Sequence, residues 1–314
     1  MARVGRLPAR CTRGLSHIAL DRIRIIGFSK PPALAVALRG GGFAREGIEP
    51  IFTRTPSSER QIQGLLAGEW DVAHTAVDNV FEYVDAEDAD LVLVLVGEVG
   101  TDIRLLAREA TGIASLRGRR LGVDSPRSGY ALMAYLILEK NGIGRGAYEV
   151  IQVGGSTERG RALVAGVVDF AMLGTPHDEQ AVAAGCHVLA EAARYIPGYP
   201  ALTVAVRRSW GVAHRDLLVR YSRALLTAIR TAADPAQRAA TIDALAAELD
   251  GDHVLAERTY DRAARAREGS APPSIGEMRA AAGRALEMRR AVAGGSGADL
   301  DRYVDLSYAE AARV

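Results

Sequence analysis

The chain alternates between short apolar runs and longer segments in which apolar residues recur every three or four positions. The first pattern predicts β-strands and the second predicts α-helices. Predicted strands lie at residues 22–28, 48–54, 70–76, 91–98, 104–109, 120–125, 148–154, 168–174 and 202–208. Predicted helices lie at 33–42, 57–68, 77–86, 128–142 and 156–166, with a helical turn at 113–116, and the chain is helical again from residue 214 to a last helix at 301–313. Strands that alternate with helices predict an α/β fold with mostly parallel sheets.

The pattern occurs twice along the chain. Residues 65–73, LLAGEWDVA, match residues 163–171, LVAGVVDFA, at a constant offset of 98 positions. Just upstream, the SSER at 57–60 is echoed by STER at 156–159. A repeat of this length is too long for a solenoid and predicts two similar α/β lobes. Asp71 and Asp169 occupy equal positions in the two copies, where we expect them to fix the turn before a strand. Ser58 and Gln61 fit a capping box at the start of a helix.

Composition narrows the classes of function. The 314 residues carry 39 basic and 38 acidic side chains, so the net charge of +1 gives no field that would attract nucleic acid or an anionic membrane. Only Lys30 and Lys140 are lysines, and the other basic residues are arginines. Cys11 and Cys186 could form at most one bridge, and neither they nor the six histidines show the spacing of a metal site. We therefore expect no metal, no cofactor and no nucleic-acid partner.

Residues 1–20 form an N-terminal extension with four arginines and no acidic residue. A secretory signal would require an apolar run after this extension, and the sequence has none there. The sequence also contains no run of eighteen apolar residues, so it predicts no membrane span. As written, the sequence predicts a cytoplasmic protein. A wrongly assigned start codon is the competing explanation, and it would make the protein periplasmic.

Four segments stand out in order along the chain: GFSKPPALAVALRGGGFAREGIEP, GLLAGEWDVAHTAVDNV, LRGRRLGVDSPRSGYALMAYLILEKNGI and DLDRYVDLSYAEAARV. Together they resemble the type II periplasmic solute-binding proteins for nitrate, sulfonate, taurine and thiamine precursors, and the resemblance covers about residues 22–313. It implies a two-lobed fold in which one lobe (99–202) is inserted into a discontinuous one (21–98 and 203–314). The ligands of this family are small and often anionic. The family also contains cytoplasmic enzymes, but the desulfinases carry a cysteine where this chain has Ser29, and the cysteine-rich motif of the pyrimidine synthases is absent.

Ligands of open parallel sheets bind beyond the carboxyl ends of the strands, so the loops at those ends supply the candidate site. Lys30 could contact a ligand anion, serve as a catalytic amine or be solvated, and Ser29 could donate a hydrogen bond or only cap a helix. Asp78 could hold a ligand amine or cap its helix, and Tyr130 could stack on a ligand or pack in the core. His74 and His177 could face the cleft, although an isolated histidine is usually structural. The full set of candidates is Ser29, Lys30, Pro31, Thr55, Thr75, Asp78, Ser125, Ser128, Tyr130, Thr157 and Thr175.

Two functions fit this pattern. The first is a monomeric binding protein for a small, anionic ligand, with an ABC permease as its candidate partner. The second is a cytoplasmic enzyme on the same scaffold, such as a decarboxylase or lyase. The absence of a catalytic cluster favours binding, and the absence of a signal peptide favours the enzyme.

Overall fold

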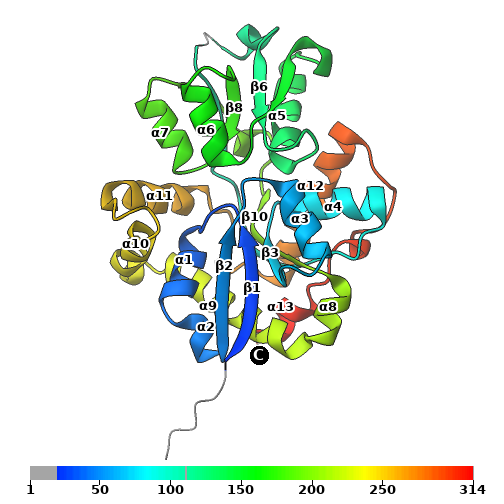
Figure 1. Ribbon diagram of the computed structural model, residues 1–314, viewed down its shortest axis with the longest axis vertical. Coiled ribbons are helices and arrows are strands. Elements are labelled where there is room, and N and C mark those ends of the chain that lie inside the picture. Colours follow the sequence, from blue (N-terminus) through cyan, green and yellow to red (C-terminus); the bar gives the residue numbers. More distant parts are fainter. Residues whose placement is uncertain (1–19, 110–111, 314) are drawn as a thin grey trace, which may run out of the picture.

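The computed structural model describes residues 20–109 and 112–313, which form two lobes with one five-stranded sheet each (Figure 1). In lobe 1 the strand order of sheet A is β2-β1-β3-β10-β4. Because β10 runs antiparallel to both of its neighbours, the other four strands share one direction. The strands are β1 (Asp21–Gly27), β2 (Ile48–Arg54), β3 (Val72–His74), β4 (Val92–Val99) and β10 (Pro200–Val206).

Lobe 2 repeats this arrangement in sheet B, with the order β7-β6-β8-β5-β9. Here β5 is the antiparallel strand, so each sheet is mostly parallel, as the sequence predicts. The strands are β5 (Arg104–Ala107), β6 (Arg120–Val123), β7 (Glu149–Gln152), β8 (Phe170–Leu173) and β9 (His187–Glu191). The helices of lobe 2 are α5 (Gly129–Lys140), α6 (Ser156–Val164) and α7 (His177–Ala183), with short 3₁₀ turns at Ile113–Leu116, Arg145–Ala147 and Ala192–Arg194.

Helices bury their apolar faces against both sheets. In α9, Leu218, Tyr221, Leu225 and Ile229 form one buried stripe, because residues three or four positions apart share a helix face. The helices α9, α12 and α13 pack on β4, which is buried along almost its whole length. The helices of lobe 1 are α1 (Pro32–Arg39), α2 (Gly42–Arg45), α3 (Ser58–Leu66), α4 (Val77–Glu87), α8 (Arg208–Ala213), α9 (Arg215–Ala233), α10 (Arg238–Ala246), α11 (His253–Ala266), α12 (Ile275–Ala293) and α13 (Ser307–Ala311), with 3₁₀ turns at Pro235–Gln237 and Leu300–Arg302.

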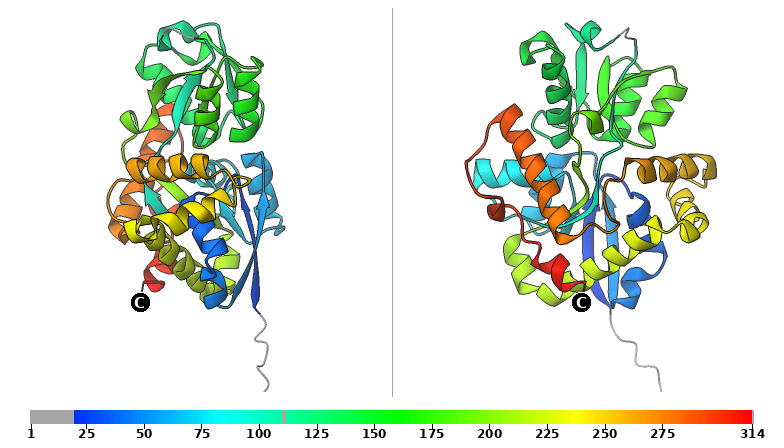
Figure 2. Two further views of the ribbon diagram at one scale, coloured as in Figure 1. Left: turned by 90° about the vertical axis from the view of Figure 1, so that its left-hand side faces the viewer. Right: turned by 180° about the vertical axis from the view of Figure 1, so that it is seen from behind.

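Two segments connect the lobes, one between β4 and β5 and the other between β9 and β10 (Figure 1). The α10–α11 pair stands on one flank of lobe 1 below α7, and α12 reaches up to pack against α5 of lobe 2 (Figures 1 and 2). No helix among the described residues combines the length and apolarity needed to cross a bilayer.

The sequence repeat has a direct structural counterpart. Asp71 accepts hydrogen bonds from the backbone N–H and guanidinium of Arg24, and Asp169 accepts the same bonds from Arg120. Each aspartate precedes a strand of its sheet and ties it to a neighbouring strand. The two aspartates therefore have an equivalent structural role, as their equal positions predicted, but their side chains bond to a neighbouring strand and not within the turn that we expected them to fix.

Two local predictions were wrong. Ser57, not Ser58, caps α3, because its hydroxyl accepts from the N–H of Arg60, while Gln61 is buried and donates to two strand carbonyls. The predicted last helix is interrupted, because Val304 forms a β-bridge with Leu93 and α13 starts only at Ser307.

Candidate functional site

A cavity of about 710 Å³ lies between the lobes. Six loops at the carboxyl ends of predicted strands contribute to its wall, near residues 29–31, 54, 74–76, 124–130, 156–157 and 174–177. The two connecting segments add residues 98–103 and 199–203, and the α10–α11 pair closes one side. A small molecule in this cavity would touch both lobes and both connections at once.

Most of the candidate residues line this cavity, namely Ser29, Lys30, Pro31, Thr75, Ser128, Tyr130, Thr157 and Thr175. Thr55, Asp78 and Ser125 do not belong to its lining. Thr55 bonds to the backbone of Ser57, and Ser125 accepts a bond from the N–H of Arg127. Both of these side chains therefore shape their own loops.

Asp78 is fully buried at the start of α4, where its carboxylate accepts a hydrogen bond from the phenol of Tyr199. Burial raises the pKa of Asp78 to about 6, although Tyr199 and Arg289 oppose the shift. Gly129 lies directly against this pair, since a Cβ at that position would be 2.7 Å from the Asp78 carboxylate. Asp78 thus sits in the contact between the lobes rather than in the cavity.

Lys30 lines the cavity, but its charge is already compensated. Its Nζ lies 2.5 Å from Glu248, which follows α10 and also accepts a bond from Arg39 at 2.7 Å. Burial would raise the pKa of Glu248, but these two cations outweigh it and the pKa is lowered. Lys30 is therefore not a free positive charge, as a contact to a ligand anion would favour, but belongs to an ion-pair network.

Arg159 of α6 forms the floor of the cavity on the lobe 2 side. It is almost fully buried, and its Nη1 lies 3.3 Å from the Asp124 carboxylate and also donates to Gly154 O. Its Nε donates to Met172 O and its Nη2 to the hydroxyl of Ser156. Asp124 also accepts a bond from Ser128 at 2.7 Å. Arg159 thereby fixes the starts of both α5 and α6.

Tyr130 lies over this floor, with the Arg159 guanidinium 5.1 Å from its ring centre. Burial raises the pKa of Tyr130 to about 12, so the phenol stays protonated. It is thus a neutral aromatic surface that ends in a hydrogen-bond donor.

Both candidate histidines line the cavity. Burial lowers the pKa of His74 to about 4, and its Nε2 lies 2.7 Å from the phenol of Tyr221, so it stays neutral near pH 7. Burial also lowers the pKa of His177, whose Nε2 lies 3.3 Å from the Thr157 hydroxyl. Neither imidazole has a carboxylate among these partners, so the arrangement does not resemble a nucleophile–base–acid triad.

Glu98, Asp102 and Arg267 form the wall at the connecting segments. Burial raises the pKa of Glu98; Arg267 opposes this shift and Asp102 adds to it. Asp102 accepts a hydrogen bond from the Thr175 hydroxyl at 2.5 Å. This wall therefore contains two acidic side chains, Glu98 and Asp102, that the sequence analysis did not identify.

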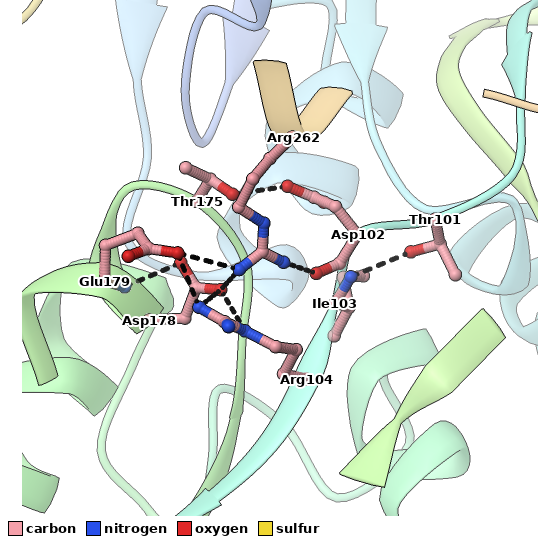
Figure 3. Close-up of polar contacts among 8 residues, drawn as sticks. All are labelled: Thr101, Asp102, Ile103, Arg104, Thr175, Asp178, Glu179 and Arg262. Carbon is pink, nitrogen blue, oxygen red and sulfur yellow. Dashed lines mark hydrogen bonds and ion pairs between the residues drawn. The ribbon is translucent and has the colours of Figure 1, made fainter. Parts of the chain in front are cut away.

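An ion-pair cluster next to this wall joins the lobes (Figure 3). Arg262 of α11 reaches from lobe 1 to Asp178 at 2.6 Å and Glu179 at 3.0 Å on α7, and it donates to the carbonyl of Asp102 at 2.5 Å. Arg104 of β5 bonds to the same two carboxylates from within lobe 2. Arg54 makes a second inter-lobe contact, to Thr157 at 2.6 Å. These contacts hold the lobes together around the cavity.

No group of three or more metal-ligating side chains occurs within residues 20–109 and 112–313. Cys186 is a buried free thiol, and Cys11 lies outside the described residues, as does nearly all of the N-terminal extension.

Sequence reasoning missed several charged residues of the site, which are Arg54, Glu98, Asp102, Arg159, Glu248, Arg262 and Arg267. The signal for Arg159 was its place in the repeat, as the last residue of STER. In the structure it corresponds to Gln61, 98 positions earlier, and both side chains donate to strand carbonyls. For the other residues the sequence holds no such signal, because their partners lie far away along the chain.

Comparisons with known proteins agree with this architecture. Residues 26–247 match the model of the NMT1-like family, whereas the search of curated proteins gives no match. The ligand-binding component of an ABC-type import system from Staphylococcus aureus, solved with zinc bound, has a TM-score of 0.76 at 11% identity, covering 92% of this chain and 98% of that chain. The alkanesulfonate-binding protein SsuA from Xanthomonas axonopodis pv. citri, bound to MOPS, has a TM-score of 0.72 at 17% identity, with coverage of 88% and 94%. The desulfurization enzyme DSZB has a TM-score of 0.66 at 15% identity, with coverage of 93% and 99%. At these identities the likeness concerns the fold, which both binding proteins and an enzyme share.

Proposed function

Because the chain belongs to the NMT1-like family, we propose that it is a monomeric binding protein for a small molecule with an anionic group, and that it delivers this molecule to an ABC-type importer. The observation that carries the proposal is the cavity of about 710 Å³, whose wall is shared by both lobes and both connections. A ligand that touches both lobes stabilises the closed form relative to the open form. The ABC import component and SsuA, which have this fold, support the importer role.

The lobe division predicted from sequence is part of this proposal, with residues 21–98 and 203–314 in one lobe and 99–202 in the other. The membership of sheets A and B supports it.

We place the anionic group of the ligand near the starts of α5 and α6. Ser128, Tyr130, Ser156 and Thr157 line the cavity there, and the first N–H groups of a helix favour negative charge. Ser29 adds a hydroxyl from lobe 1. Lys30 contributes less than a free lysine would, because Glu248 compensates its charge.

An enzyme is the second candidate, and the shared fold with DSZB favours it. Lys30, His74 and His177 are the side chains that would carry its chemistry. Against it stand the ion pair that engages the Lys30 amine and the burial of both imidazoles, which lowers the pKa of His74 to about 4 and also lowers the pKa of His177.

The test is a thermal-shift screen of the purified protein against nitrate, carboxylates, sulfonates, sulfinates, amines and amides, followed by calorimetry. We expect at least one anion-bearing compound to bind in a 1:1 ratio and small-angle scattering to show a compact complex with the mass of one chain. Mass spectrometry of the recovered ligand separates binding from catalysis. If no compound of the panel binds, or if the ligand is recovered altered, the proposed function is wrong. The importer role is tested separately, since loaded protein should raise the ATPase activity of a candidate ABC importer in vesicles and ligand-free protein should not.

A further inference from the structure

Glu98 and Arg267 lie side by side in the cavity wall without a hydrogen bond between them. Their closest atoms, Glu98 Oε1 and an Arg267 Nη, are 3.9 Å apart, which is beyond hydrogen-bonding distance. The side chains are only 13% and 16% exposed, and both Glu98 Oε1 and Arg267 Nε are buried without a partner among the described residues. Buried charged groups normally have hydrogen-bond partners, so unused donors and acceptors in a cavity wall call for an explanation.

The other cations of the cavity wall differ from Arg267. Within the described part of the chain, Lys30, Arg54 and Arg159 each hydrogen-bond to a carboxylate, at 2.5, 3.4 and 3.3 Å respectively. Their charges are therefore satisfied inside the protein. The pair of Glu98 and Arg267 retains both an acidic acceptor and a basic donor that a ligand could use.

The backbone holds this pair in place. The N–H of Glu268 donates to the carbonyl of Val99 at 2.8 Å, so the segment after α11 is tied to the end of β4. Gly100 permits the close approach, because its φ is +99° and a Cβ there would be 1.9 Å from the carbonyl oxygen of Ala266. Arg267 and Glu98 therefore keep their separation through main-chain contacts rather than through a bond to each other.

We infer that Glu98 and Arg267 form a subsite for a ligand group that carries an N–H donor beside an acceptor, such as a carboxamide or a urea. This inference rests on the proposed function and specifies its ligand. The acceptor of the group binds Arg267 and its N–H binds Glu98, so both unpaired side chains are satisfied together. A carboxylate or sulfonate at this place would meet Arg267 but would be repelled by Glu98 and by Asp102 beside it. The anionic group of the ligand is therefore at the other end of the molecule, near α5 and α6.

The test uses 4-carbamoylbenzoate and terephthalate, which both carry a carboxylate for the end of the cavity near α5 and α6. They differ at the opposite end, where only 4-carbamoylbenzoate has N–H donors. At pH 8, calorimetry of the wild type should show 4-carbamoylbenzoate binding more tightly than terephthalate, by about ten- to a hundredfold for one charge-assisted hydrogen bond. Glu98→Gln supplies a donor of its own, so it should bind terephthalate more tightly than the wild type does and bring the two affinities together. Glu257→Gln makes the same chemical change at an exposed position of α11 and should keep the wild-type preference.

Improved terephthalate binding by Glu98→Gln cannot come from a loss of folding, so the test remains informative even if the variant is less stable. The inference is overturned if 4-carbamoylbenzoate does not bind the wild type, if terephthalate binds it more tightly, or if Glu98→Gln keeps the wild-type ratio of the two affinities. In each of these cases the proposed function stands as long as another compound of the screening panel binds.

Discussion

Replacing Arg262 by methionine should shift the protein from its closed form toward an open one. The guanidinium is the part of α11 that reaches across to Asp178 and Glu179 of lobe 2, and it also donates to the carbonyl of Asp102 (Figure 3). Methionine keeps much of the length and apolar contact of the side chain but none of these bonds. The substitution therefore acts on the contact between the lobes.

The magnitude follows from what each partner retains. Asp178 is fully buried, but Arg104 still bonds to it at 2.6 Å, so the substitution does not leave an unpaired buried carboxylate. The closed form loses the charge-assisted hydrogen bonds of Arg262. Their net contribution is reduced because the arginine would be hydrated in the open form, so we expect the closed form to be destabilised by about 2–4 kcal/mol relative to the open form. This corresponds to roughly a thirty- to eight-hundredfold shift in the closed–open equilibrium.

The assay measures ligand dissociation by stopped flow and the radius of gyration by small-angle scattering. We expect Arg262→Met to release the ligand at least ten times faster and to give a larger radius without ligand, while Arg262→Lys keeps part of the effect. Arg265→Met, at an exposed position of the same helix, is the matched control. The reasoning is refuted if Arg262→Met and Arg265→Met give the same dissociation rate and the same radius.

Two further predictions concern stability. The folded-state pKa of Asp78 is raised from 3.8 to about 6, so folding loses stability as the pH rises through this range, by about 3 kcal/mol. Asp78→Asn removes this penalty. In urea unfolding, the free energy of unfolding of the variant should therefore rise relative to that of the wild type by about 3 kcal/mol between about pH 3.5 and 7. A difference between the two proteins that does not change with pH contradicts the assignment. Arg159→Met leaves the buried Asp124 carboxylate with only the Ser128 hydroxyl as a partner, so the free energy of unfolding should fall by about 3–5 kcal/mol. Arg161→Met, on the exposed side of α6, is the control and should change the free energy of unfolding by less than about 0.5 kcal/mol. A loss below 1 kcal/mol at Arg159 would show that Asp124 has another source of compensation.

Most of the fold could be predicted from local patterns in the sequence. The offset of 98 residues predicted two lobes of similar build, and the equal positions of Asp71 and Asp169 predicted their shared role. The direction of β5 and β10 was not predictable in this way, because strand pairing is a non-local property. The helix α7 and the strand β9 were not identified either, because β9 is mostly exposed and α7 has only two buried residues, so neither shows a clear apolar pattern.

The charges of the site illustrate the same limit. Lys30 was conspicuous as one of two lysines, yet its partner Glu248 lies 218 positions further along the chain. Asp78 was an equally reasonable candidate, but its closest partner is Tyr199, 121 positions away, and that pairing removes it from the cavity wall. Sequence reasoning identified the loops that line the cavity, and the compensation of their charges depended on contacts between distant segments.

The position of β10 also sets the order in which the protein can be completed during synthesis. Sheet B ends with β9 at Glu191, so lobe 2 has all its strands before sheet A does. Sheet A needs β10 between β3 and β4, and these two strands cannot be joined until residue 206 has left the ribosome. Until then the edges of β3 and β4 that β10 will cover stay open, and open edges are the parts of a sheet most prone to pairing with another chain. The growing chain therefore passes through a stage in which one half can be finished while the other still exposes apolar strand surface, and this stage is where a chaperone would have most to protect.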